Sequence, residues 1–276
     1  MKVMITTALF DIDREKSGDG RGMDQYLQWF RETLKVKCDL TVYTEKRFED
    51  FVLQNRKIIP YKTIVVLQEL KDIPFYKNRE RMAAIMKMYS YNFKMRDPNR
   101  IECFLPEYNL IQYSKFGWLK KTAEASPKHD YFFWMDAGCS RFFLDTDLEK
   151  EWPDTSSLDK NKFIIQRNTY FPELWENLDI NKYIWDNRCM LVGTLFGGGK
   201  DVILKMKKTI DNICEKVFFA NNCINNEQMA LAIASKVHTE MFDIKKQCLE
   251  GEEEGSSHLP LFKSLSVDYV RKINEK

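Results

Sequence analysis

A single carboxylate at the end of an apolar segment is the first group in this sequence that suits chemistry. Asp136 directly follows YFFWM, which we predict to be a buried strand over residues 131–135. Because an uncompensated buried charge costs roughly several kcal/mol, Asp136 must meet a cation or hydrogen-bond donors. Two interpretations have equal weight: a Mg²⁺ or Mn²⁺ ion that bridges Asp136 to a diphosphate, or a turn cap that pairs with Arg141.

A second acidic pair, Asp145 and Asp147, matches the D-x-D pattern of metal-binding carboxylates more literally. This pair lies beyond the predicted strand end, in a segment crowded with charge. Thr146 followed by Glu149 has the spacing of a capping box, which places Asp147 in the first turn of a short helix. We therefore favour a helix start over a metal site at these residues.

The segment GTLFGGGKD contains three consecutive glycines: Gly197, Gly198 and Gly199. It is not a phosphate-binding P-loop, because Thr194 stands where that motif needs its first glycine and Asp201 where it needs serine or threonine. Consecutive glycines still indicate a positive φ or a close approach of the backbone to another group. A sugar ring against this backbone and a tight turn are both open interpretations.

Glu227 lies in the first turn of the helix predicted for NNEQMALAIA, with Asn225 or Asn226 as the N-cap. Complementing the helix dipole, worth about 0.3–1 kcal/mol, is sufficient reason for a glutamate there. Its position after the glycine-rich strand also suits a general base that removes the proton of an acceptor hydroxyl.

The first predicted strand, within KVMITTALF, ends near residues that suit a nucleotide. Phe10 is placed to stack on a base, and Arg14 to contact a phosphate. A core phenylalanine and a solvated arginine are equally well supported by the local pattern. The candidate residues at this strand end are Thr6, Phe10, Asp11 and Arg14.

Apolar strand patterns alternate with helical patterns along the chain. KVMITTALF, CDLTVYT, KTIVVLQEL and YFFWM read as strands, and YNLIQYSKFGWLKKTAEA as a long helix that ends at Ser126. The alternation predicts an α/β fold with a mainly parallel twisted sheet, flanked by helices on both faces, whose ligands gather at the carboxyl ends of the strands. Because no linker-like segment interrupts it, we expect a single domain over residues 1–276.

The composition argues against several kinds of partner. Basic and acidic residues nearly balance at 43 and 41, so no global field favours nucleic acid. The basic segment KNRERMAAIMKMY, interrupted by Glu80, has the apolar spacing of a solvated helix. The seven cysteines of the chain form no C-x-x-C pair. Neither a signal peptide nor a membrane-spanning run is evident in the sequence. We expect a cytoplasmic protein and leave a peripheral membrane contact open.

Several of these segments occur together, in this order, in one known family. ITTALFDIDR, the central helix with FFWMDAG, VGTLFGGGKDVI and NNEQMALAIA make the chain resemble the HtrL/YibB-like, or WlaTC-like, glycosyltransferases over about residues 3–245. The most specific part of the resemblance is the W-x-D-A-G segment of Trp134, Asp136, Ala137 and Gly138. It implies a GT-A fold with a Rossmann-like nucleotide-sugar-binding half over 1–140 and an acceptor-binding half over 141–276.

The resemblance also implies roles for individual residues. Asp136 would contact the metal or the diphosphate, while Gly138 offers no second carboxylate. GT-A enzymes often add a histidine near the C-terminus, and His258 is the available metal ligand. Lys115, on the helix before the strand, is placed to neutralise phosphate.

These observations predict transfer of a sugar from a UDP-sugar to a hydroxyl of an oligosaccharide, glycoprotein or lipid-linked glycan, assisted by Mn²⁺ or Mg²⁺. Arg14 and Lys115 would stabilise the departing diphosphate, with the sugar near the three glycines. Glu227 would be the base if the reaction inverts configuration. Two alternatives stay open: a nucleotidyltransferase, which needs several carboxylates around paired metals, and a non-catalytic nucleotide- or glycan-binding module.

Overall fold

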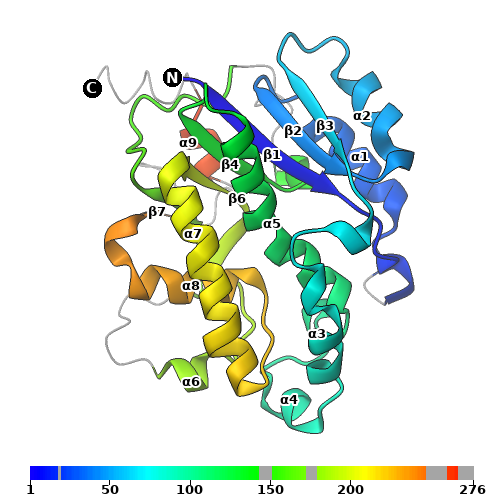
Figure 1. Ribbon diagram of the computed structural model, residues 1–276, viewed down its shortest axis with the longest axis vertical. Helices are drawn as coiled ribbons and strands as arrows, with labels where there is room; N and C mark the ends of the chain where they lie inside the picture. The colour runs from blue at the N-terminus through cyan, green and yellow to red at the C-terminus, as the bar shows by residue number, and fades with distance from the viewer. Residues whose placement is uncertain (18–19, 143–150, 172–178, 247–259, 267–276) are drawn as a thin grey trace.

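A seven-stranded sheet forms the centre of the computed structural model, which describes residues 1–17, 20–142, 151–171, 179–246 and 260–266 (Figure 1). The strand order is β3-β2-β1-β4-β6-β5-β7, and only β6 runs antiparallel to both of its neighbours. The predicted α/β domain with a mainly parallel sheet is therefore confirmed. The strands are β1 (Val3–Leu9), β2 (Asp39–Thr44), β3 (Thr63–Leu67), β4 (Tyr131–Met135), β5 (Phe163–Arg167), β6 (Leu191–Gly199) and β7 (Phe242–Lys245).

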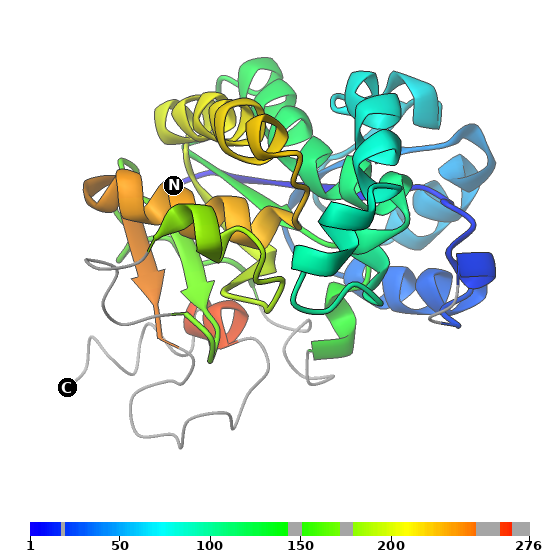
Figure 2. The ribbon, with the colours of Figure 1, turned by 90° about the horizontal axis from the view of Figure 1, so that it is seen from below.

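Helices cover both faces of the sheet, as predicted (Figure 1, Figure 2). One face packs against α1 (Met23–Thr33), α2 (Glu49–Arg56) and α9 (Pro260–Ser264). The hydrophobic cluster on the opposite face includes residues of α3 (Arg79–Met86), α4 (Tyr89–Lys94), α5 (Pro106–Ala125), α6 (Ile180–Tyr183), α7 (Lys200–Ile213) and α8 (Glu227–Val237). No helix among the described residues is long and apolar enough to cross a membrane.

The two helical layers explain why the central strands read as continuous apolar runs. Successive side chains of a strand point to opposite faces, and here each face is buried in its own hydrophobic cluster. In β4, Phe132 and Trp134 join the cluster beneath α5 and α7, while Tyr131, Phe133 and Met135 join the cluster beneath α1 and α9. All five of these side chains are at most 1% exposed.

Two helix predictions can be compared with the structure. The long central helix is α5, and its C-cap is Ser126, as the sequence predicts. The basic segment over 77–89 is helical, although it forms a short turn, then α3, and then the first residue of α4. The helix start predicted at Asp145 and Asp147 lies outside the described residues.

The three consecutive glycines belong to strand β6 and not to a turn. Gly197 and Gly199 pair with Phe133 and Tyr131 of β4, and all three glycines keep ordinary extended backbone. An added Cβ would lie 2.4 Å from Phe132 O at Gly197 and 2.6 Å from Lys162 O at Gly198. The tight turn was therefore a wrong interpretation, because the glycines allow a close approach between strands.

Gly197→Ala should destabilise the fold, since the new Cβ would lie 2.4 Å from Phe132 O and 2.5 Å from the Phe133 ring. Overpacking a core costs about 1–3 kcal/mol, and we expect a loss of this size in the free energy of unfolding measured with urea. Gly22→Ala is the matched control, because its Cβ meets only the flexible end of Glu15. A Gly197→Ala chain as stable as the native one would contradict the close packing.

Candidate active site

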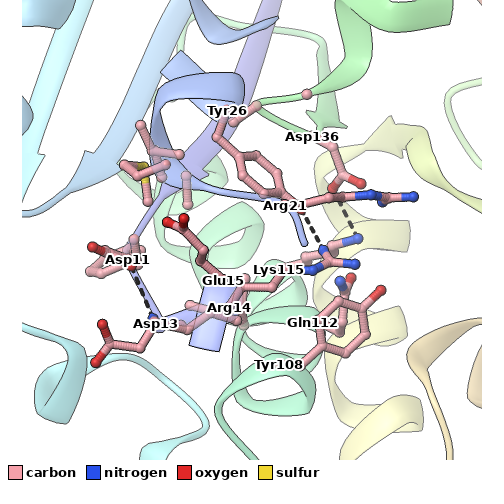
Figure 3. Close-up of a pocket in the computed structure, with 18 of the residues that line it drawn as sticks. Asp11, Asp13, Arg14, Glu15, Arg21, Tyr26, Tyr108, Gln112, Lys115 and Asp136 are labelled. Atoms are coloured by element: carbon pink, nitrogen blue, oxygen red, sulfur yellow. Dashed lines mark hydrogen bonds and ion pairs between the residues drawn. The ribbon is translucent and has the colours of Figure 1, made fainter. Parts of the chain in front are cut away.

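A cavity of about 460 Å³ opens where the parallel strands β1 and β4 end (Figure 3). Its walls are the segment after β1 with the 3-10 turn Arg14–Ser17, the start of α1, the amino-terminal half of α5, and residues 134–141. The carboxyl edge of parallel strands is where sheets of this class collect ligands. The predicted Phe10, Asp11, Arg14, Lys115 and Asp136 all line this cavity.

Lys115 joins the cavity to the interior of the protein. Its ammonium group lies 2.9 Å from Asp136 Oδ1, 2.8 Å from Glu227 Oε1 and 3.0 Å from the carbonyl oxygen of Gly193. These three acceptors match the three N–H donors of an ammonium group. Burial lowers the pKa of Lys115, but the Asp136 and Glu227 carboxylates outweigh it and raise the pKa above its ordinary value. The side chain is therefore a fixed positive charge.

Asp136 is held from two sides and still reaches the cavity. Trp134 Nε1 donates a hydrogen bond of 2.6 Å to the same Oδ1 that contacts Lys115. The Asp136 side chain is 29% exposed, and its Oδ2 atom has no hydrogen bond within the described part of the chain. Asp136 thus pairs with Lys115 instead of Arg141, which packs over the rings of Trp29 and Phe142.

Glu227 is buried behind Lys115. It is the first residue of α8, whose N-cap is Asn226, as predicted. Glu227 is 2% exposed, and a Cβ on Gly193 would lie 2.1 Å from its Oε1, so this neighbour must be glycine. Burial raises the pKa of Glu227, while Lys115 acts in the opposite direction. The predicted base does not line the cavity, because its carboxylate is turned toward the ammonium group.

Further basic and aromatic side chains line the cavity together with Lys115 and Asp136. Arg14 donates a hydrogen bond to the Tyr26 hydroxyl, and its guanidinium carbon lies 5.1 Å from the centre of the Tyr108 ring. Figure 3 shows the side chains of Arg14 and Arg21 reaching toward Lys115 and Asp136. Arg141 also lines this space. The arrangement suits a ligand that carries negative charge.

Three residues predicted to contact the nucleotide, Thr6, Phe10 and Asp11, have other contacts in the structure. Thr6 is fully buried in β1 and does not line the cavity. Phe10 lines it, but one face of its ring is stacked on Trp118 at 5.4 Å, so the role in base stacking is restricted to the other face. Asp11 accepts a hydrogen bond from Asp13 N and lies 3.3 Å from Arg47.

The three glycines lie near the edge of the sheet where β4 begins, so they are not placed for the predicted sugar contact. Gly199 pairs with Tyr131 at the start of β4, whereas Leu195 pairs with Met135 at its end. Gly197, Gly198 and Gly199 therefore approach the edge opposite to Asp136, and none of them lines the cavity. The physical reason is the reversed direction of β6.

The residues that the structure describes do not fit a divalent-cation site. They contain no group of three or more histidine, cysteine, aspartate or glutamate side chains that could hold a metal ion. One oxygen of Asp136 is already occupied by Lys115 and Trp134. The other predicted ligand, His258, lies outside the described residues.

The helical spacing of residues on α5 could have predicted part of the cavity wall from the sequence. Tyr108, Ile111, Gln112 and Lys115 all line the cavity from α5. Their spacings of three and four residues place them on one face of a helix. Gly193, in contrast, carries no such local signal, because its role depends on Glu227 packing against it.

The family is decided by a match along most of the chain. Residues 1–252 match the model of a family described as "Bacterial protein of unknown function (HtrL_YibB)". The chain belongs to this family. The finer WlaTC-like resemblance receives no support from this match, and no curated protein matches the chain.

Several solved structures are similar to this HtrL/YibB chain at low sequence identity and with TM-scores below 0.5. Core-mannan synthase A from Aspergillus fumigatus, in a Mn/GDP form, is 9% identical, with 93% of this chain and 80% of that chain covered and a TM-score of 0.48. Mouse xyloside xylosyltransferase 1 is 8% identical, with coverages of 96% and 93% and a TM-score of 0.45. The inositol-1-phosphate CTP transferase from T. maritima is 12% identical, with coverages of 89% and 85% and a TM-score of 0.40. These similarities do not assign an activity to the chain.

Lys115→Met should strongly destabilise the fold, because Asp136 and Glu227 would lose the cation between them. Removing one partner of a buried ion pair costs about 3–5 kcal/mol, which urea denaturation at neutral pH measures as lost free energy of unfolding. Burial already raises the pKa of Glu227 in the native chain, and removing Lys115, which lowers that pKa, should raise it further. The loss should therefore shrink as the pH falls through the folded pKa and be smallest below the ordinary value of 4.5.

Adding Glu227→Gln to Lys115→Met is the control for this experiment. The amide keeps the shape of the side chain and carries no charge, so it should restore part of the lost stability and remove much of the pH dependence. An equal deficit in the single and double variants would show that the uncompensated charge of Glu227 is not its cause.

Proposed function

We propose that this chain is a glycosyltransferase, which moves a sugar from a nucleotide-sugar donor to a hydroxyl group of a glycan acceptor. The observation that carries the proposal is the cavity at the ends of β1 and β4, where Arg14, Arg21 and Arg141 share the walls with an anchored carboxylate. Guanidinium groups suit the oxygens of a diphosphate. The volume of about 460 Å³ is in the usual range for small ligands, about 300–1,000 Å³.

The donor in this proposal is a UDP-sugar, and the arginines bind its diphosphate. Transfer breaks the bond between the anomeric carbon and a diphosphate oxygen, which leaves negative charge on the diphosphate and positive charge on the sugar. Arg14 is already oriented by the Tyr26 hydroxyl and the Tyr108 ring, so little of its freedom is lost when it meets the leaving group. The Asp136 carboxylate accepts a hydrogen bond from a hydroxyl of the donor.

The position of the cavity indicates which part of the chain binds the donor. All of its lining residues fall between Ala8 and Arg141. Apart from Arg141, these residues lie in the half predicted over 1–140, which supports placing the donor there and the glycan, whether oligosaccharide, glycoprotein or lipid-linked, in the half over 141–276. A nucleotidyltransferase is less well supported, because it needs carboxylates that converge on paired metal ions, and the described residues hold no such group.

A Mn²⁺ or Mg²⁺ ion at Asp136 belongs to this proposal only if His258 or another residue beyond the described ones completes its ligands. When bound, such an ion would supply further positive charge to the diphosphate. The arginines and Asp136 have the roles given above without it.

Glu227 acts through Lys115 in this proposal. The ammonium group, held by Glu227 and the Gly193 carbonyl, fixes the Oδ1 atom of Asp136 and so decides where Oδ2 faces the donor. Glu227 is therefore a positioning residue.

UDP should raise the melting temperature of the native chain, and Arg14→Gln should reduce that shift. A hydrogen bond to a charged group contributes about 1.5–3 kcal/mol, so we expect UDP to bind about ten- to a hundred-fold more weakly, as measured by calorimetry. Arg31→Gln, on α1 but away from the cavity, is the matched control and should bind UDP normally. The absence of binding by any nucleoside diphosphate would overturn the proposal.

The same titration with Mn²⁺ tests the metal separately. A larger shift with UDP and Mn²⁺ together, lost in Asp136→Asn, would support an ion at this carboxylate. An equal shift with and without Mn²⁺ would remove the ion from donor binding.

Glu227→Gln distinguishes positioning from base catalysis. Loss of a general base lowers kcat by about 10²–10⁴ at unchanged donor affinity. A positioning role predicts a smaller loss that is divided between kcat and KM, because the ammonium group keeps its contact with Asp136 but loses one charged partner. The measurement is kcat and KM for UDP release, with and without acceptor, from a UDP-sugar that the native chain accepts.

A further inference from the structure

The short helix α4 lies at the lower end of the molecule in Figure 1, and two of its aromatic side chains are exposed to solvent. Tyr89 is 82% exposed and Phe93 is 78% exposed, and their rings stack on each other with centres 6.1 Å apart. Met88, directly before the helix, is 36% exposed. Exposed apolar residues that adjoin one another, unlike scattered single ones, indicate an interaction site.

The opposite side of α4 is firmly anchored. Tyr91 is 1% exposed, and its hydroxyl donates a hydrogen bond of 3.0 Å to the carbonyl oxygen of Ile224. Met95, just after the helix, is 4% exposed. The outward position of Tyr89 and Phe93 is therefore set by the fold, since a rotation of α4 that buried them would expose Tyr91.

The segment of the chain that contains these aromatic residues is basic in sequence, although Arg79, Arg81, Arg96 and Arg100 pair with acidic residues outside it. Residues 71–100 contain eight basic and three acidic residues, a net charge of +5 in a chain whose total is +2. Lys87 and Lys94 flank the aromatic pair, are exposed, and form no ion pair within the described part of the chain. We call Lys87, Met88, Tyr89, Phe93 and Lys94 the α4 surface.

A cleft of about 460 Å³ adjoins the α4 surface between α4 and α6. Lys94, Arg96 and Lys182 line it, and the Lys94 ammonium lies 4.9 Å from the centre of the Trp185 ring. Two acidic residues, Asp179 and Asp186, also line it, and Asp186 lies 2.5 Å from Arg188 and 4.0 Å from Arg96. The cleft therefore offers basic groups beside the exposed aromatic rings.

We propose that the α4 surface docks on an anionic phospholipid membrane. Aromatic residues such as Tyr89 and Phe93 lie favourably at the boundary between headgroups and acyl chains, and lysines contribute by attraction to anionic lipids. A nucleic acid fits less well, because the guanidinium groups of this region are engaged: Arg79 pairs with Glu107 at 2.7 Å and Arg81 with Glu215 at 2.8 Å. The contact is peripheral and independent of the proposed sugar transfer.

Sedimentation of the full chain with lipid vesicles tests this proposal. We expect binding to vesicles that contain phosphatidylglycerol, weakening with added salt, and little binding to phosphatidylcholine alone. Replacing both lysines (Lys87→Gln, Lys94→Gln) should lower the partition coefficient about thirty-fold. Replacing both aromatic residues (Tyr89→Ser, Phe93→Ser) should lower it at least about ten-fold.

The matched control is the double variant Lys57→Gln, Ile58→Ser, which removes an exposed lysine and an apolar side chain that is 87% exposed beyond α2. It should bind vesicles like the native chain, and all variants should keep the native melting temperature. Lack of binding to anionic vesicles, or equal losses in the control, would overturn the proposal. Binding of a single-stranded oligonucleotide without vesicle binding would identify a nucleic-acid surface instead.

Discussion

One ammonium group holds together segments that are far apart in the sequence. Lys115 on α5 meets Asp136 after β4, Glu227 at the start of α8 and the carbonyl oxygen of Gly193 in β6. A buried charge is stable only while its partners stay in place, so displacing any one of these elements exposes the remaining charges to an apolar surrounding. The walls of the cavity are therefore fixed from the protein interior.

The aromatic core beneath this ion pair supports the same geometry. The rings of Phe10, Trp118 and Trp134 form a stack, with centres 5.4 Å and 6.0 Å apart. Trp134 ends the stack, donates its indole hydrogen to Asp136 and lies 5.6 Å from the Lys115 ammonium. Core packing and electrostatics thus determine one carboxylate orientation together, which is the preorganisation that a binding site needs.

The sequence was informative wherever a feature depends on neighbouring residues. The apolar runs predicted the strands, and the rule for the carboxyl edge placed Asp136 and Arg14 together before any contact was known. The direction of β6 was not predictable, because an apolar strand reads alike in either direction, and the interpretation of Gly197 failed for this reason. Glu227 was correctly placed at a helix start, but its partner Lys115 is 112 residues away, and no local pattern encodes such a pairing.

The antiparallel direction of β6 also determines which connecting segment lies at the edge of the sheet that holds the cavity. Because β5 runs antiparallel to β6, the chain between Arg167 and Leu191 begins and ends at the edge where β4 delivers Asp136. The turn from Gly199 into α7 lies at the far edge, tightly packed against Lys160. Evolution of a new specificity would therefore proceed through insertions ahead of β6, while the segment after it is constrained to change little.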